Sequence, residues 1–179
     1  MRHGRRLVAL APALLMAGCV AAPPIERPAP QPRFDAFAFF EGASEGQATL
    51  RVMFHRAVSV TVHSQGRREP DGSLILEQRI EQAGKPARGR TWHLRETAPG
   101  RYAGSLSDAA GPVAGETDGN RLHLAFAMKG GLPTDQWLTL APDGRSARNI
   151  LTVRKFGITV AVLDETIRRV SGTGSAGRP

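Results

Sequence analysis

The sequence predicts an all-β protein, namely an antiparallel up-and-down β-barrel of about nine or ten strands. Apolar and polar residues alternate in short segments from Gly46 onward, which is the pattern of strands with one buried face. Turn sequences separate these segments, such as Pro-Asp-Gly at residues 70–72 and Asp-Gly-Asn at residues 118–120. No long stretch has helical periodicity, and short connections make consecutive strands antiparallel neighbours. Closing such a meander into a barrel removes its exposed edges.

The apolar residues of each predicted strand share one parity and are expected to face the barrel interior. In chain order the alternating sets are Leu50, Val52 and Phe54; Val58, Val60 and Val62; Leu74, Leu76, Gln78 and Ile80; Trp92 and Leu94; Tyr102, Gly104 and Leu106; Leu122, Leu124, Phe126 and Met128; Leu138 and Leu140; Leu151 and Val153; and Ile158, Val160 and Val162. Asp164 and Glu165 interrupt the alternation in the last segment, and we expect a β-bulge there.

Residues 1–18 are predicted to be a secretory signal peptide. A basic start precedes an apolar run of eleven residues, Leu7 to Ala17, which is too short to cross a bilayer as a helix. The sequence Met-Ala-Gly-Cys at residues 16–19 resembles a bacterial lipobox. That resemblance implies lipidation of the Cys19 thiol and cleavage of the chain just before it. Cys19 is the only cysteine, so it has no disulfide partner within the chain.

Three segments follow the signal peptide. Residues 19–33 contain the lipidated cysteine and a proline-rich tether, which we expect to be extended and to hold the domain off a membrane. Residues 34–170 form the barrel domain. It opens with an aromatic cluster in which Asp35 caps a short helical turn that plugs the core. Residues 171–179 are predicted to be a flexible polar tail.

The formal net charge is +8, but the arginines are scattered through strands and turns. Because no basic helix interleaves with aromatic residues, nucleic acid is not an expected partner. The basic surface is either simply solvated or contacts anionic lipid headgroups or sugars. Val20, and not aspartate, follows Cys19. By comparison with enteric lipoproteins, we therefore expect the chain in the periplasmic leaflet of the outer membrane.

Several short motifs occur in a distinctive order. They are Gly42-x-x-x-Gly46, Leu76-Glu77, Arg90-Thr91-Trp92, the glycine-rich stretch from Tyr102 to Asn120, Asp135-Gln136-Trp137, Asn149 and Lys155-Phe156-Gly157. Together they resemble the Gram-negative lipoprotein family DUF3833 over about residues 39–170. The resemblance implies an envelope location and no particular reaction, because the family has no assigned activity. The β-meander and its Phe-Phe-x-Gly opening are also similar to lipocalin-type (calycin-like) barrels, which is an analogy of fold alone.

Bulky residues on the inward face are expected to line a ligand site, and Arg90 among them suits an anionic headgroup. The candidate ligand-binding residues are Glu77, Arg90, Trp92, Tyr102, Asp108, Asn120, Phe126 and Trp137. An inward arginine needs a partner. Glu77 lies on the neighbouring predicted strand but reaches the interior only if a bulge shifts its register. A structural ion pair between Glu77 and Arg90 is therefore the alternative to a ligand clamp.

The leading hypothesis is a non-enzymatic, membrane-anchored envelope lipoprotein whose barrel binds a lipid or another apolar small molecule. The alternative is an interaction module with a solid barrel whose outer surface contacts envelope proteins. A third possibility is a hydrolase or isomerase that uses Asp108, Asp135 or Glu77. We predict no catalytic residues, no metal ligands and no cofactor, because the histidines lack the spacing of metal motifs and no GxSxG sequence is present.

Overall fold

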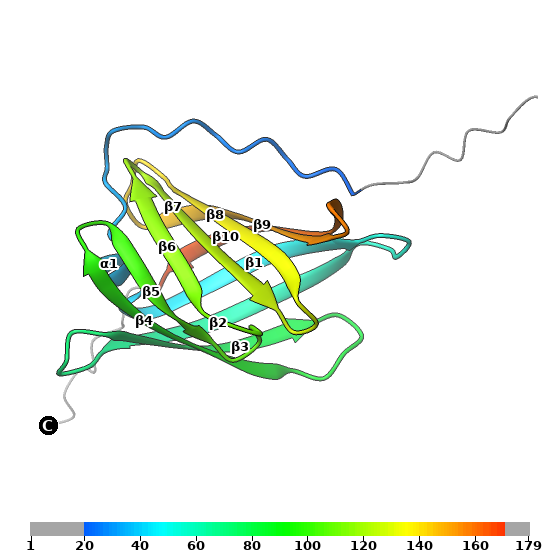
Figure 1. Cartoon of the computed structure of the whole chain (residues 1–179), viewed down its shortest axis with the longest axis horizontal. Coiled ribbons are helices and arrows are strands. Elements are labelled where there is room, and N and C mark those ends of the chain that lie inside the picture. Colours follow the sequence, from blue (N-terminus) through cyan, green and yellow to red (C-terminus); the bar gives the residue numbers. More distant parts are fainter. Residues whose placement is uncertain (1–19, 171–179) are drawn as a thin grey trace, which may run out of the picture.

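The computed structural model describes residues 20–170, which form a closed barrel of ten antiparallel strands preceded by one short helix (Figure 1). The predicted all-β, up-and-down barrel is thereby confirmed, and its ten strands agree with the expected number. Within residues 20–170 no helix combines the length and the apolar character needed to cross a bilayer. Cys19, the signal peptide and the polar tail all lie outside the described residues.

The strands follow one another around the barrel in the order of the chain. The elements are α1 (Ala36–Phe40), β1 (Gly42–Val52), β2 (Val58–Arg68), β3 (Leu74–Gln82), β4 (Arg88–Ala98), β5 (Arg101–Leu106), β6 (Val113–Asp118), β7 (Arg121–Met128), β8 (Leu132–Leu140), β9 (Ser146–Lys155) and β10 (Ile158–Arg169). Each strand pairs with the next, and β1 also pairs with β10. This last pairing closes the sheet, so that no strand of the barrel is left as a free edge.

The register places a row of polar residues across the first four strands. Ser44 on β1 lies opposite Ser64 on β2, which in turn lies opposite Gln78 on β3. Gln78 lies opposite Arg90 on β4. Arg90 shares its parity with the buried Trp92, and successive side chains of a strand point to opposite faces. The row therefore belongs to the interior of the barrel, as the alternation predicted for Arg90.

The helix α1 plugs one end of the barrel. The Asp35 carboxylate caps it by accepting hydrogen bonds from the backbone N–H groups of Phe37 and Ala38, as predicted. The phenylalanines of the cluster are buried against the ends of the strands. Gly66 on β2 makes room for the helix, because a Cβ there would lie 1.9 Å from the carbonyl oxygen of Phe40.

The two ends of the barrel differ. We call the end closed by α1 the helix end. The opposite end, the hairpin end, carries the turns at residues 53–57, 83–87, 107–112, 129–131 and 156–157. Figure 1 shows the helix end on the left and the hairpin end on the right. A continuous core with many aromatic side chains fills the helix end and continues along β5–β7 to Leu106, Val113 and Phe126, near turns of the hairpin end. A smaller aliphatic core, formed by Ala48, Val60, Val62 and Ile80, lies on the wall of β1–β3.

Residues 20–33 run along the outer wall of the barrel in an extended conformation (Figure 1). The side-chain oxygen of Asn120 accepts a hydrogen bond of 2.7 Å from the backbone N–H of Ala29. Beside this segment, Ile150 is buried although its parity on β9 points outward. The predicted tether is extended, as expected. It lies on the barrel and does not stand apart from it, because the outer wall offers it hydrogen-bond partners and apolar surface.

Candidate functional site

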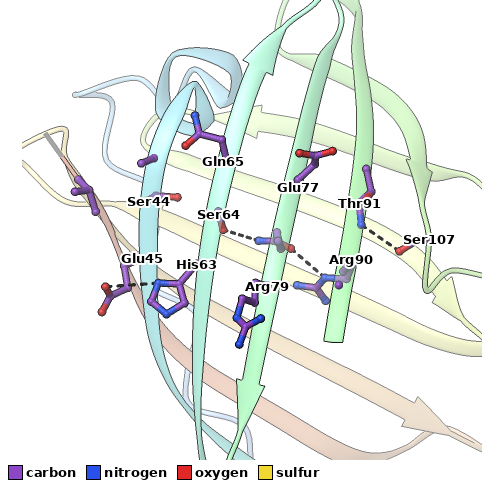
Figure 2. Close-up of a pocket in the computed structure, with 14 residues that line it drawn as sticks. Ser44, Glu45, His63, Ser64, Gln65, Glu77, Arg79, Arg90, Thr91 and Ser107 are labelled. Atoms are coloured by element: carbon purple, nitrogen blue, oxygen red, sulfur yellow. Dashed lines mark hydrogen bonds and ion pairs between the residues drawn. The ribbon is translucent and has the colours of Figure 1, made fainter. Parts of the chain in front are cut away.

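The inward polar row is linked by side-chain hydrogen bonds centred on Gln78 (Figure 2). The Gln78 amide N–H donates to the Ser64 hydroxyl at 3.0 Å. Its oxygen accepts from Arg90 Nε at 3.0 Å and from the indole N–H of Trp92 at 2.8 Å. Gln78 thus holds both the guanidinium of Arg90 and the ring of Trp92 in fixed positions inside the barrel.

Arg90 is an inward-facing cation without an ion-pair partner. Among residues 20–170, no carboxylate oxygen lies within 4.0 Å of its guanidinium. The guanidinium carbon lies 5.5 Å from the centre of the Trp92 ring. Burial lowers the pKa of Arg90 to about 10, and the more distant charges of Asp108 and Glu165 only partly oppose this effect. An anion bound next to the guanidinium would therefore stabilise the charged form of Arg90.

Glu165 is the acidic counterpart of Arg90 in the interior. It is buried on β10, and one carboxylate oxygen accepts a hydrogen bond of 2.7 Å from the side-chain amide of Asn149. Burial raises the pKa of Glu165, although the Asn149 hydrogen bond and the Arg90 charge act in the opposite direction. Gly46 leaves room for this carboxylate, because a Cβ there would lie 1.9 Å from its oxygen.

Three buried side-chain polar atoms of the described chain have no hydrogen-bond partner. They are Ser44 Oγ, Gln136 Oε1 and Asn149 Oδ1. All three residues share the inward parity of their strands, opposite Ser64, Leu124 and Leu138 respectively. Buried polar atoms are normally satisfied. The middle of the barrel is therefore a polar layer with unused hydrogen-bonding capacity.

Some inward-facing residues toward the hairpin end are partly exposed, whereas others there, such as Val60, Ile80, Leu106 and Val113, are buried like those at the helix end. The partly exposed set is Leu50, Gln78, Arg90, Met128, Leu151, Val153 and Leu163. Most of these side chains are aliphatic. The arrangement places an accessible apolar wall next to a guanidinium and an amide, which is the composition that an amphiphilic molecule requires.

A hollow with a volume of about 670 Å³ lies at β1–β4, and its lining includes both outward-facing residues and the inward row Ser44, Ser64, Gln78 and Arg90 (Figure 2). Its exposed side chains include Glu45, His63 and Glu77. The Glu45 carboxylate lies 3.8 Å from His63 Nδ1, and the Glu77 carboxylate lies 3.8 Å from a guanidinium nitrogen of Arg67. Such exposed pairs contribute little energy. The hollow is open and of mixed charge, and Arg90 and Gln78 are the members of its lining that the interior hydrogen-bond network holds in place.

The structure brings three of the predicted site residues together in the continuous core. Trp92 and Phe126 meet edge to face, with ring centres 5.5 Å apart. Tyr102 packs against Phe37 of α1 at 5.6 Å. All are buried, and the polar tips of Trp92 and Tyr102 have hydrogen bonds to Gln78 and to the Ala36 backbone. Their side chains therefore occupy the part of the barrel interior where the sequence predicted an open ligand site.

Trp137, expected inside, lies on the outer wall. Its neighbour Leu138 is buried with inward parity, so that Trp137 must face outward. There it stacks on the His123 ring at 3.8 Å, and the Arg121 guanidinium lies 4.6 Å from its ring centre. The expectation of an inward Trp137 was wrong, because it did not follow the parity of residues 138 and 140.

The remaining predicted residues do not converge. Glu77 is exposed on the outer face and pairs with Arg67, so the proposed ion pair between Glu77 and Arg90 does not form. The acids considered for catalysis are dispersed, since Asp108 pairs with Arg88 and Asp135 lies between His123 and Arg154. Asn120 positions residues 20–33 and donates to the Leu140 carbonyl at 2.9 Å. Within residues 20–170 no group of three or more His, Cys, Asp or Glu side chains is arranged to hold a metal ion.

Sequence analysis missed Glu165 as an interior residue. It interpreted the acidic pair at residues 164 and 165 as a sign of a bulge, whereas the irregularity in β10 lies between Thr159 and Ala161. Glu165 pairs regularly with Asn149, and it shares its parity with Leu163 and Ile167. That shared parity was a signal that could have found it.

Comparisons with known proteins support the fold. The barrel is similar to the structure of an S-type phycobiliprotein lyase from Guillardia theta, with a TM-score of 0.58 and 8% identity over 75% of this chain and 90% of that chain. It is also similar to a protein of unknown function from the DUF3598 family of Nostoc punctiforme, with a TM-score of 0.50 and 14% identity over 81% of this chain and 51% of that one. These low identities indicate a shared fold alone. No curated protein matches the sequence. Residues 13–169 match the family model described as "Protein of unknown function (DUF3833)", and the chain therefore belongs to the DUF3833 family.

Proposed function

We propose that this chain is a membrane-anchored envelope lipoprotein whose barrel binds an amphiphilic molecule with an anionic headgroup. The observation that carries the proposal is Arg90. It is an inward guanidinium with no carboxylate within 4.0 Å among the described residues. The headgroup would bind at Arg90, and the apolar part would lie toward the hairpin end.

The energetics of Arg90 favour an anionic ligand. A buried charge without a partner is destabilising, and an added carboxylate or phosphate would compensate it. Of the guanidinium nitrogens, Nε donates to Gln78, and a guanidinium binds carboxylate or phosphate through its other N–H groups as well. The Gln78 contact would thereby orient Arg90 for such binding.

The surroundings of Arg90 suit the rest of such a molecule. The partly exposed inward residues toward the hairpin end include Leu50, Leu151 and Leu163. An aliphatic chain placed against them would remove apolar surface from water, which is favourable by about 25 cal/mol per Å². The ligand chemistry expected on these grounds is that of a fatty acid or a lipid with one compact anionic group.

A second candidate function is the interaction module with a solid barrel. The observation in its favour is the filled helix end, where Trp92 and Tyr102 are buried with their polar tips satisfied. This packing removes the aromatic residues from the list of proposed ligand contacts. The two candidate functions therefore make different predictions only for the polar layer and the hairpin end. A ligand would contact these regions in the lipid-binding barrel but not in the interaction module.

Binding of matched ligands to the mature chain tests the proposal. Residues 19–179 carrying Cys19→Ser would be titrated with oleate and with its uncharged methyl ester. We expect Arg90→Gln to weaken oleate binding about tenfold or more, because charge-assisted hydrogen bonds contribute about 1.5–3 kcal/mol, and to leave the ester unaffected. Arg79→Gln, on the outer face of β3, is the matched control and should change neither. Failure of the wild-type chain to bind either compound would favour the interaction module.

A further inference from the structure

Two exposed phenylalanines mark the hairpin end. Phe54 is 89% exposed in the turn between β1 and β2, and Phe156 is 91% exposed in the turn between β9 and β10. Ile158, beside Phe156, is 43% exposed. The two hairpins are neighbours, because β1 pairs with β10 and the Met53 N–H donates to the Val160 carbonyl at 2.8 Å. These side chains therefore form one apolar tip, which we define as Phe54, Phe156 and Ile158.

Both phenylalanines occupy backbone positions that favour glycine. Their φ angles are +63° for Phe54 and +52° for Phe156, and the described chain has no other non-glycine residue with positive φ. A bulky residue is strained in this region, whereas glycine is not. Neither ring is buried in the protein, so packing within the barrel does not account for them. An aromatic side chain held at this cost and exposed to water indicates an external partner.

The charge around the apolar tip is positive. The five turns of the hairpin end contain three cations, Arg56, Lys85 and Lys129, and one carboxylate, Asp108. Lys155 adds a further cation, with its ammonium nitrogen 5.5 Å from the centre of the Phe156 ring. By contrast, the four turns of the helix end, residues 69–73, 99–100, 119–120 and 141–145, contain three carboxylates and one arginine. Apolar rings surrounded by cations are complementary to an anionic lipid surface.

The beginning of the described chain lies at the same end. The backbone N–H of Val20 is 3.4 Å from the Thr159 carbonyl, and Val20 lines a hollow together with Phe54 and His55. Figure 1 shows that the described chain, in blue, begins near the hairpin of β9 and β10. Residues 1–19 precede this point. An anchor at Cys19 would therefore emerge next to the apolar tip, and both would reach the same bilayer.

We propose that the hairpin end is a membrane-docking surface, in which Phe54 and Phe156 insert into the interfacial region of an anionic bilayer while Arg56 and Lys155 contact its headgroups. Aromatic side chains favour this interface because their rings are apolar and flat. Docking in this orientation turns the hairpin end toward the bilayer, with the partly exposed inward residues Leu50, Leu151 and Leu163 on that side. An amphiphile could then pass between bilayer and barrel with little exposure to water. This inference rests on the envelope location in the proposed function. It concerns the protein surface that contacts the bilayer and not the acyl anchor.

Vesicle binding by the unacylated mature chain tests this inference. Residues 19–179 carrying Cys19→Ser would be mixed with vesicles of phosphatidylcholine alone or with about 30% phosphatidylglycerol, and bound protein would be separated by flotation. The test variant is Phe54→Gly with Phe156→Gly. Because glycine fits both backbone positions, this variant should melt no lower than the wild-type chain. Val170→Gly, an exposed apolar residue at the helix end, is the matched control.

We expect binding to the anionic vesicles, a loss of about tenfold or more in the glycine double variant, and no change in the Val170→Gly control. The tryptophan introduced by Phe54→Trp or by Phe156→Trp should shift its emission to the blue on binding, and the one introduced by Val170→Trp should not. Equal binding by the wild-type chain and the double variant, or binding by neither, would overturn the docking surface. Self-association in solution that depends on the two phenylalanines would overturn it as well, because the partner would then be a second copy. Since the chain in this assay carries no lipid, a failure of Cys19 acylation in cells leaves the result unaffected, and the two proposals can fail separately.

Discussion

Glu165 and Arg90 place opposite charges in the barrel interior without forming an ion pair. Glu165 accepts from Asn149 and Arg90 donates to Gln78, so that amides and not the opposite charge hold each group. Burial raises the pKa of Glu165 and lowers that of Arg90. Both shifts have the sign that desolvation gives to an incompletely compensated charge. Each of the two charges is therefore only partly compensated inside the barrel.

The raised pKa of Glu165 predicts that the protein loses stability as the pH rises. The native state holds the Glu165 proton up to a higher pH than the unfolded chain, whose glutamate pKa is about 4.3. The stabilisation from the protonated group is complete below that value and is lost as the pH rises through the folded-state pKa. We expect Glu165→Gln to raise the melting temperature at pH 7–8 and to have little effect at about pH 4.

Thermal unfolding of Glu165→Gln across this pH range, followed by circular dichroism, measures the effect. Glu77→Gln is the matched control. Its carboxylate is exposed on the outer face of β3 and forms only a surface pair with Arg67, so its removal should change stability little. A lower melting temperature for Glu165→Gln at pH 7 would mean that attraction to Arg90 outweighs the cost of burying the carboxylate.

At the scale of elements, α1 converts an open barrel into one with a closed end. Its phenylalanines supply much of the aromatic core at the helix end. The helix has only five residues and is too short to be stable by itself. Its position therefore depends on the Asp35 cap and on close contact with Gly66 of β2.

The contact at Gly66 predicts that replacing this glycine by alanine lowers the free energy of unfolding much more than the same change at Gly89. In Gly66→Ala the new Cβ would lie 1.9 Å from the Phe40 carbonyl oxygen, so that α1 must move away from the strand. We expect a loss of about 1–3 kcal/mol in the free energy of unfolding. Gly89→Ala on β4 meets no atom within 4 Å and should stay within about 0.5 kcal/mol of the wild-type chain. Urea denaturation of both variants measures the difference, and equal stabilities would show that α1 does not depend on this contact.

At the scale of the whole molecule, the two ends of the barrel differ in what covers them and in the charge of their turns. The helix end is packed by α1, whereas the hairpin end carries the apolar tip, most of the cations in the turns and the start of the described chain. Residues 20–33 run from the hairpin end to the helix end along the outer wall (Figure 1). An anchor at the beginning of this segment would therefore hold the hairpin end close to the membrane.

The resemblance of residues 16–19 to a lipobox predicts that membrane attachment depends on Cys19. In cells that express the full-length chain, Cys19→Ser should prevent labelling by palmitate and should leave residues 1–18 attached, because cleavage follows lipidation. Met16→Leu is the matched control, since leucine is common at that position of a lipobox, and it should be processed normally. Density fractionation should place the wild-type protein in the outer membrane. Normal cleavage of Cys19→Ser would indicate an ordinary signal peptide.

The sequence by itself determined the fold class, the antiparallel order of the strands, their approximate number and the capped helix at the entrance. These features are encoded locally. A period of two specifies a strand with one buried face, turn residues specify where the chain reverses, and Asp35 caps the turn that it begins. Local patterns also placed Arg90 inside, because its parity matches that of Trp92. They could equally have placed Trp137 outside and Glu165 inside, had the parity of their neighbours been followed.

Only the tertiary structure decided which of these residues meet. Closure of the barrel brings β1 against β10, so that Gly46 accommodates Glu165, and the β1–β2 and β9–β10 turns place Phe54 near Phe156. Likewise, the docking of residues 20–33 depends on Asn120, which is distant in sequence. Periodicity fixes the face on which a side chain lies but not its neighbour across the barrel, because that neighbour is set by the register and closure of the whole sheet. For this reason the sequence predicted the barrel and its helical plug, while the polar layer and the apolar tip came from the structure.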